Sequence, residues 1–268
     1  MNTFFNGRDT WLHKINPSLK LFTITCLFIF AITIHQLNLM VAFSSVVLLL
    51  FLFGTGHPLK HILLFSLPFI LIFVSTSSSM ILFGKGVTTL FKWGYVHITE
   101  ESLLRGIHLG FRALTFAMLG LIFALTTKPV KLFYSLMQQL KLPSKYAYSF
   151  MAAIRLIPIM IEEFHTIRNA QKVRGAKRSG KIIEKIHRMY AMAIPLLSQS
   201  IRRAFRIAVA MEAKRFDSTK KRTFYYHVGF TKFDLIFLSY FIFMIALSYK
   251  FSTYFPLFPD TDVRFSND

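Results

Sequence analysis

The stretch "LFTITCLFIFAITIHQLNLMVAFSSVVLLLFLFGTGHPL", residues 21–59, contains no Lys, Arg, Asp or Glu. A helix needs about 20 apolar residues to cross the hydrocarbon core of a bilayer, so this stretch is too long for a single span. It divides at the polar residues 36–38 into two predicted spans, 21–35 and 39–53. The following "GTGHP" carries the glycine and proline signals of a turn that ends the second span.

Three further apolar blocks raise the predicted number of spans to five. They are residues 62–83, 106–127 and 235–249. The chain of 268 residues is 54% hydrophobic and only 16% charged, whereas about 25% of the residues of an average soluble domain are charged. The sequence therefore predicts an all-α polytopic membrane protein with about five transmembrane helices.

Most of the positive charge is concentrated in one segment. Residues 128–222 contain 21 Lys or Arg against 5 Asp or Glu, in a chain whose formal net charge is +20. Basic loops of membrane proteins tend to stay in the cytoplasm, which places this segment and the basic N-terminus inside. The charge-free turn at 36–38 and the acidic C-terminal tail are expected outside. Five spans of the cell membrane then leave the N-terminus cytoplasmic and the C-terminus external.

The chain is accordingly expected to have three parts. Residues 1–127 form a membrane domain with four spans, residues 128–222 a basic cytoplasmic α-helical domain, and residues 223–268 the last span with an external tail. Contact of the basic domain with the lipid bilayer is expected, at about 1 kcal/mol per cation near the surface. Nucleic-acid binding is not expected, because the domain has no zinc-ligand spacing, RNP-like aromatic motif or helix-turn-helix pattern.

The first half of the basic domain predicts a long helix from about Tyr146 to Val173, with Pro158 as a bend. Gly175 follows where a helix commonly ends in a left-handed cap, so Arg174 lies beside the last, unpaired carbonyls. On its own this pattern is a helix stop whose cations complement the negative end of the helix dipole.

The second half predicts another helix, from Ile182 to about Met211, which Pro195 splits or bends. A weakly polar face recurs at steps of three or four residues, made of Ile186, Met189, Ala193, Leu196, Ser200, Ala204, Ile207 and Met211. The helix end "MEAKRF" again carries cations, at Lys214 and Arg215. Two similar basic ends predict a partner with two similar pockets, and a symmetric dimer offers two equivalent sites.

No constellation of catalytic or metal-binding residues stands out in the sequence, and no metal or cofactor is expected. The nine histidines are scattered. Glu162 and Glu163 are adjacent and point to different faces of a helix, and we expect them to form ion pairs with cations such as Arg155 or Arg168. No glycine-rich nucleotide-binding loop is present, so any ATPase is expected on a separate chain.

Three residues or stretches of the spans carry expectations about packing. The serine-rich "STSSS", residues 75–79, is expected to let helices pack closely. Cys26 is expected to be a small buried hydrophobe. Arg112 is expected to lie near the outer interface and to extend its charge towards it.

Four stretches of the chain form a recognisable series. They are "WLHKINPSLKLF" (11–22), "FRALTFAMLGLIFALTTKPVKL" (111–132), "IRLIPIMIEEFHTIRNAQKVRG" (154–175) and "RRAFRIAVAMEAKRF" (202–216). The third combines Arg-x-x-Pro, an acidic pair and Ala-Gln-x-x-Arg-Gly. In order and spacing the series resembles the T component, or CbiQ-like transmembrane subunit, of energy-coupling factor (ECF) transporters, a branch of the ABC transporters. The likeness covers most of the chain.

The resemblance implies two sites of contact with ATPases. In this family two Ala-Arg-Gly signatures end the coupling helices and insert into grooves on two cytoplasmic ATPase subunits. By position, the signatures fall on Ala170, Gln171, Arg174, Gly175, Ala213, Lys214 and Arg215. In the second signature Lys214 stands where arginine is expected and Arg215 where glycine is expected. Either Lys214 acts as a point charge, because lysine cannot make a forked contact, or Arg215 takes over after a local twist.

The resemblance also implies a function without catalysis. The two ATPases would move the coupling helices, with bends at Pro158 and Pro195. That motion would reach a small membrane-embedded S component that binds the substrate, a vitamin or a transition metal such as cobalt. Two alternatives stay open: a self-sufficient polytopic permease, and a membrane scaffold that docks another acidic cytoplasmic protein.

Overall fold

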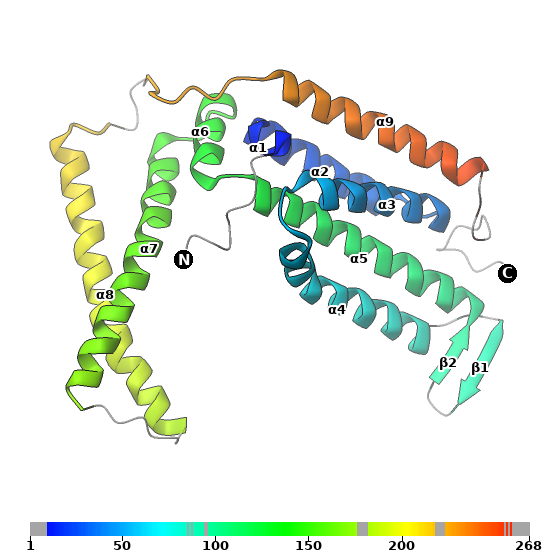
Figure 1. Cartoon of the computed structure of the whole chain (residues 1–268), viewed down its shortest axis with the longest axis horizontal. Helices are drawn as coiled ribbons and strands as arrows, with labels where there is room; N and C mark the ends of the chain where they lie inside the picture. Colours follow the sequence, from blue (N-terminus) through cyan, green and yellow to red (C-terminus); the bar gives the residue numbers. More distant parts are fainter. Residues whose placement is uncertain are drawn as a thin grey trace. The chain divides into compact units, whose positions relative to one another are not determined.

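The computed structural model of the chain describes residues 10–84, 86, 88–93, 96–175, 182–217, 223–254, 256 and 258. Within these residues the chain forms nine helices and one two-stranded hairpin (Figure 1). In chain order the elements are α1 (Trp11–Lys14), α2 (Pro17–Thr33), α3 (Leu37–Gly54), α4 (Leu59–Phe83), β1 (Thr89–Trp93), β2 (Val96–Thr99), α5 (Glu100–Thr126), α6 (Pro129–Gln139), α7 (Ser144–Val173), α8 (Ile182–Ala213) and α9 (Lys232–Tyr254).

Four of the described helices are long and apolar enough to cross a membrane. They are α3, residues Lys60–Phe83 of α4, α5 and α9. Helix α2 is also apolar but has 17 residues, which is about the shortest length that crosses a bilayer. The structure thus confirms an all-α polytopic membrane protein. The fifth span, expected at the position of α2, stays a prediction.

The chain divides into two compact units. Unit 1 consists of Met1–Ser135 and Val228–Asp268, and it contains all four candidate spans. Unit 2 consists of Leu136–His227 and contains α7 and α8. The functional division into residues 1–127, 128–222 and 223–268 stays a prediction.

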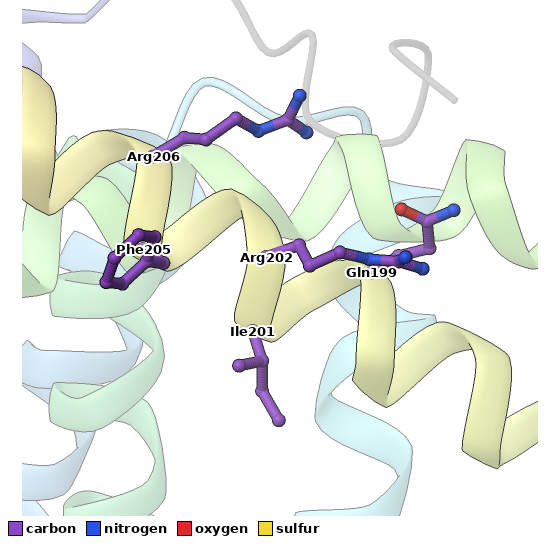
Figure 2. Close-up of a pocket in the computed structure, with 5 residues that line it drawn as sticks. All are labelled: Gln199, Ile201, Arg202, Phe205 and Arg206. Carbon is purple, nitrogen blue, oxygen red and sulfur yellow. The ribbon is translucent and has the colours of Figure 1, made fainter.

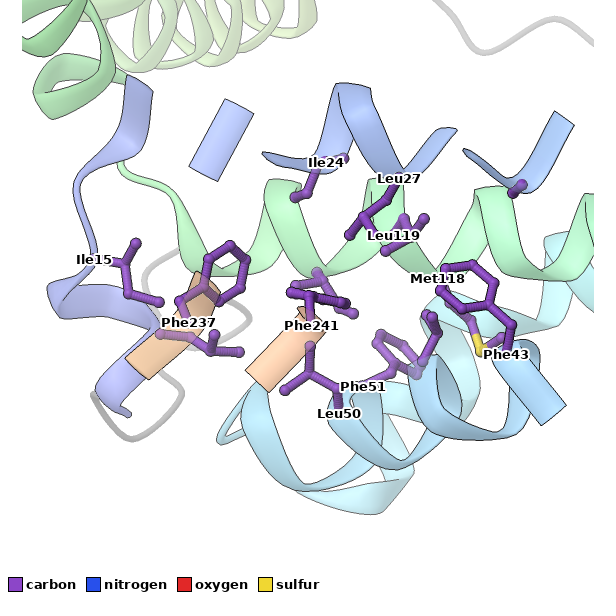
Figure 3. Packing of buried hydrophobic residues seen from close by; sticks show 14 of the residues in the cluster. Ile15, Ile24, Leu27, Phe43, Leu50, Phe51, Met118, Leu119, Phe237 and Phe241 are labelled. Atoms are coloured by element: carbon purple, nitrogen blue, oxygen red, sulfur yellow. The ribbon is translucent and has the colours of Figure 1, made fainter. Parts of the chain in front are cut away.

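Helix α5 is the central helix of unit 1. It packs against α2, α3 and α4, and α3 packs in turn against α9. The buried centre of the bundle is apolar (Figure 3), and it includes Leu27, Phe43, Phe51, Leu119, Ile122, Phe237 and Phe241. In a bilayer the surrounding lipid is as apolar as these side chains, so close packing rather than removal from water holds the helices together.

Small residues bring α4 and α5 close together. A Cβ atom on Gly106 would lie 2.5 Å from a side-chain atom of Ile81 and 2.9 Å from the carbonyl oxygen of Ser77. One turn further along α5, a Cβ atom on Gly110 would lie 2.8 Å from the ring of Phe73. Ser77 is buried, so the packing role predicted for the serine-rich stretch is confirmed for this serine.

A short antiparallel hairpin, β1–β2, connects α4 to α5, where the sequence predicted only an external connection. Its strands have 5 and 4 residues, a pattern too short to stand out between long apolar helices. Helix α5 begins directly after it, because the hydroxyl of Thr99 accepts the backbone N–H of Ser102. Glu100 and Glu101 lie in the first turn, beside the positive end of the helix dipole.

Two side chains within the predicted spans, Cys26 and Arg112, carried expectations; only that for Cys26 is contradicted. Cys26 is exposed on the surface of α2, so its predicted burial was wrong. A lipid-facing position is as apolar as a buried one, and the sequence does not separate the two. The guanidinium of Arg112 donates hydrogen bonds to the carbonyl oxygens of Ile34 at 2.6 Å and Ile32 at 3.4 Å. It therefore binds the unpaired carbonyls at the C-terminal end of α2.

Candidate docking site on unit 2

Helix α7 ends at the first of the two basic signatures. The backbone N–H of Arg174 donates to the carbonyl of Ala170 at 3.1 Å, and that of Gly175 donates to Lys172 at 3.1 Å. Gly175 has φ +78°, in the left-handed region that glycine adopts without steric cost. The predicted left-handed helix stop is confirmed, and it leaves the side chain of Arg174 exposed at the helix end.

Helix α8 ends with the same geometry, although it has no glycine there. The N–H of Arg215 donates to the carbonyl of Glu212 at 2.8 Å, and that of Phe216 donates to Met211 at 2.9 Å. These two bonds are the pair that defines a Schellman motif. Arg215 has φ +53°, a conformation that costs a residue with a Cβ atom roughly 1–2 kcal/mol.

The two caps fix the correspondence between the signatures. Lys214 is the last residue before the left-handed position of α8, as Arg174 is in α7. Arg215 occupies the position of Gly175. The backbone therefore places Lys214, and not Arg215, at the position of Arg174. All four residues are exposed.

Helices α7 and α8 cross within unit 2 and run in opposite directions (Figure 1). At the crossing the guanidinium of Arg203 forms an ion pair with the carboxylate of Glu163. The predicted ion pair of Glu163 is confirmed, but its partner is Arg203 rather than Arg155 or Arg168, which the sequence suggested. Sequence cannot show this pairing, since the two residues are 40 positions apart.

The crossing lies the same distance from both cationic ends. Glu163 precedes Arg174 by eleven residues, and Arg203 precedes Lys214 by eleven residues. At 1.5 Å per residue each end is about 16 Å from the crossing, on opposite sides of it. The rings of Tyr148 and Phe216 meet at 5.6 Å, which holds the end of α8 against the start of α7.

The remaining residues of the predicted signatures lie in the last turns of the two helices. Ala170 and Ala213 are exposed and Gln171 is half-buried. Both helices continue unbroken through their prolines, Pro158 and Pro195, so of the two alternatives predicted for Pro195 the split is excluded. Bends at these prolines stay predictions.

Helix α8 also carries an exposed apolar stripe, of which the sequence analysis named only Ile186. Its members are Ile183, Ile186, Tyr190, Ile194, Leu197, Ile201 and Phe205, which are between 49% and 81% exposed. At 3.6 residues per turn they occupy an arc of about 100°. The predicted face contained Leu196, Ser200 and Ile207, which lie half-buried on another side of the helix. Choosing the largest apolar residues at helical steps would have found the stripe.

Cations of α8 lie away from the stripe. Figure 2 shows a surface pocket in which Arg202 and Arg206 point away from the side on which Ile201 projects. Gln199 and Phe205 complete its lining. Within the described part of the chain no group of three or more His, Cys, Asp or Glu side chains could hold a metal ion. The features of unit 2 described above are contact surfaces: two exposed cationic helix ends and an exposed apolar stripe along α8.

Comparison with known proteins identifies the family of the chain. The profile of the CbiQ family, described as "Cobalt transport protein", matches residues 8–226. The "Energy-coupling factor transporter transmembrane protein EcfT" of Limosilactobacillus fermentum is 29% identical over 240 residues, which are 86% of this chain and 89% of that protein.

Two further relatives carry the same name. The protein of Staphylococcus aureus is 29% identical over 241 residues, covering 86% of this chain and 89% of the relative. That of Ruminiclostridium cellulolyticum is 28% identical over 238 residues, covering 85% and 88%. Since the family profile matches most of its length, the chain belongs to the CbiQ family of transmembrane transport proteins.

Proposed function

We propose that this chain is the transmembrane coupling subunit of an ECF-type ABC transporter. It transmits the ATP-driven motion of two cytoplasmic ATPase subunits to a membrane-embedded S component that binds a vitamin or a transition metal. The observation that carries the proposal is the pair of backbone-equivalent, exposed cationic helix ends, Arg174 and Lys214, at equal distances from one crossing point.

Each cationic end docks into an acidic groove of one ATPase. The unpaired carbonyls at the end of a helix accept hydrogen bonds from the partner, while the cation beside them attracts a carboxylate. Arg174 can bind a carboxylate through two parallel hydrogen bonds, whereas Lys214 provides a single point charge. Two opposed ends on one rigid pair of helices fit a pair of ATPases that approach and separate.

The motions of the two ATPases, received at the two cationic ends, meet where α7 and α8 cross. The ion pair between Glu163 and Arg203 is partly buried, with 19% and 33% of the two side chains exposed. It joins the helices where they cross, and the ring contact of Tyr148 and Phe216 joins them again where α8 ends. Displacement of either cationic end by an ATPase is then passed to the other helix through these two contacts.

The apolar stripe of α8 is the surface that receives the S component. A continuous exposed apolar stripe is rare on a soluble protein, and the cations on the other side of the same helix suit the headgroup region of a bilayer. A small membrane protein lying on this stripe would follow the movement of α8. ATP hydrolysis itself takes place on the separate ATPase chains.

The orientation follows from charge. Unit 2 carries most of the excess Lys and Arg of the chain and belongs in the cytoplasm. With α2 as a fifth span of the cell membrane, the N-terminus is cytoplasmic and the C-terminus external. Accessibility of single cysteines placed at either terminus to an impermeant reagent, in intact cells, tests this topology.

The decisive experiment compares two charge reversals on the same helix. Arg174→Glu removes the docking cation, and Arg168→Glu makes the same change at an exposed position six residues earlier. When the chain is purified from membranes that contain its ATPases, Arg174→Glu should lower ATPase recovery at least tenfold and Arg168→Glu less than twofold. Equal losses would show that only surface charge matters. Substrate transport by the purified chain alone would instead establish a self-sufficient permease.

A further inference from the structure

Unit 1 contains a buried cluster of polar side chains at the start of α2. Asn16, Ser18, Ser135 and Asp234 are each at most 5% exposed. They come from three places in the chain: the N-cap and first turn of α2, the middle of α6 and the first turn of α9. Buried polar groups are costly unless they are hydrogen-bonded, so the bonds within this cluster decide what it does.

Asn16 is the centre of the cluster. Its Oδ1 accepts hydrogen bonds from the hydroxyl of Ser135 at 2.7 Å and from the hydroxyl of Ser18 at 3.0 Å. Its backbone N–H donates to Oδ1 of Asp234 at 2.7 Å, and its Nδ2 donates to the carbonyl of Gly229 at 3.3 Å. The other carboxylate oxygen of Asp234 accepts the backbone N–H of Thr231 at 2.6 Å.

Two partners of Asn16 lie where the chain passes between unit 1 and unit 2. Ser135 is the last residue of unit 1 before the chain enters unit 2 at Leu136. Gly229 follows the return of the chain into unit 1 at Val228. One residue of α2 therefore binds both connections of unit 2.

Unit 2 joins the same two connections from its own side. There the side chain of Gln138 donates to the carbonyl of Tyr226 at 2.6 Å.

The helix that carries Asn16 is anchored in the bundle by a second buried group. The ammonium of Lys20 donates to the carbonyl of Leu12 at 2.6 Å and to the hydroxyl of Thr126 at 3.0 Å. Thr126 is the last residue of the central helix α5. The cluster is thus tied to α2, α5 and α9, which are three helices of the membrane bundle.

We propose that Asn16 is a positioning residue for energy coupling, which fastens both connections of unit 2 to the membrane bundle through Ser135 and the 229–234 segment. An unfastened connection would absorb displacement of unit 2 by changing its own backbone conformation. Two connections held by one buried side chain pass that displacement on to α2 and α9 together. This inference rests on the proposed coupling function.

The chain offers a matched pair of variants for the test. Ser135→Ala and Ser18→Ala each remove one buried hydroxyl that donates to the same oxygen of Asn16. Only Ser135 belongs to a connection of unit 2. In the complete transporter in proteoliposomes, Ser135→Ala and Asn16→Ala should lower substrate uptake per ATP hydrolysed at least threefold, with ATPase recovery unchanged. Ser18→Ala should leave the ratio within 1.5-fold of wild type.

A second measurement does not depend on the ATPases. In the full chain in lipid nanodiscs, Asn16→Ala and Ser135→Ala should speed backbone hydrogen exchange at least tenfold in both connections, residues 135–142 and 228–232. Unchanged exchange, or equal uptake losses for Ser135→Ala and Ser18→Ala, would overturn the inference. If the chain captures no ATPase while exchange responds as expected, the coupling function fails and the fastening of the connections stands.

Discussion

The two basic ends of unit 2 share one backbone geometry and differ in their side chains. Helix α7 ends in Arg174 followed by Gly175 at φ +78°, and α8 ends in Lys214 followed by Arg215 at φ +53°. The left-handed cap places a cation beside the last carbonyls in both. The backbone therefore fixes where each cation lies, while the side chain decides whether the contact is a fork or a point charge.

Removing each cation in turn gives the largest expected difference between the two ends. Arg174→Ala should weaken ATPase binding by about tenfold or more, since hydrogen bonds to charged groups contribute about 1.5–3 kcal/mol. Lys214→Ala should weaken it about threefold, because one flexible ammonium is lost. Dissociation constants of the purified chain for its ATPases check this order. Equal effects would mean that the two ends bind in the same way.

Replacing Arg215 by the glycine that α7 has at the equivalent position tests the role of the left-handed backbone conformation in this comparison. Arg215→Gly removes the strain of the left-handed conformation and should stabilise the end of α8 by about 1 kcal/mol. Lys141→Gly is the control, because Lys141 also has φ +53° but follows α6. Hydrogen exchange should slow about fivefold at both sites. Arg215→Gly should alter the affinity for the ATPases, and Lys141→Gly should not. A change in affinity from Lys141→Gly would contradict docking at the end of α8.

A double-mutant cycle on the ion pair at the crossing tests whether this pair joins α7 and α8. Glu163→Gln and Arg203→Gln, singly and together, should give a coupling energy of up to about 1 kcal/mol, because the pair is partly exposed. The readout is the free energy of local unfolding of α7 and α8. A coupling energy of zero would mean that the helices are held together elsewhere.

The smallest effect is expected from Lys214→Arg, which gives the second end the side chain of the first. A forked contact in place of a point charge should strengthen ATPase binding about twofold. The same dissociation constants measure it. Weaker binding would show that the second groove is shaped for lysine.

Much of this architecture could be predicted from the sequence because it depends on local patterns. The helices α7 and α8 were expected within two residues of their observed ends, since Gly175 and the "MEAKRF" segment mark those ends locally. Apolar blocks of 15 or 22 residues likewise identified α3, α4, α5 and α9.

Features that depend on tertiary contacts could not be predicted in this way. The pairing of Glu163 with Arg203 joins residues 40 positions apart, and Asn16 meets Asp234 across 218 positions. Cys26 shows a different limit, because lipid and protein interior are both apolar and select the same residues. The left-handed conformation of Arg215 was hidden because no glycine marks it.

Photo-cross-linking from the two helix ends tests the central claim most directly. A photoreactive residue replaces Val173, Ala213, or both, in membranes that contain the ATPases. Both positions are exposed, and the neighbouring cations Arg174 and Lys214 stay in place. Each single position should cross-link to an ATPase subunit, and the doubly substituted chain should capture two. Cross-links from both positions to lipid, or to this chain itself, with no ATPase captured, would contradict this claim.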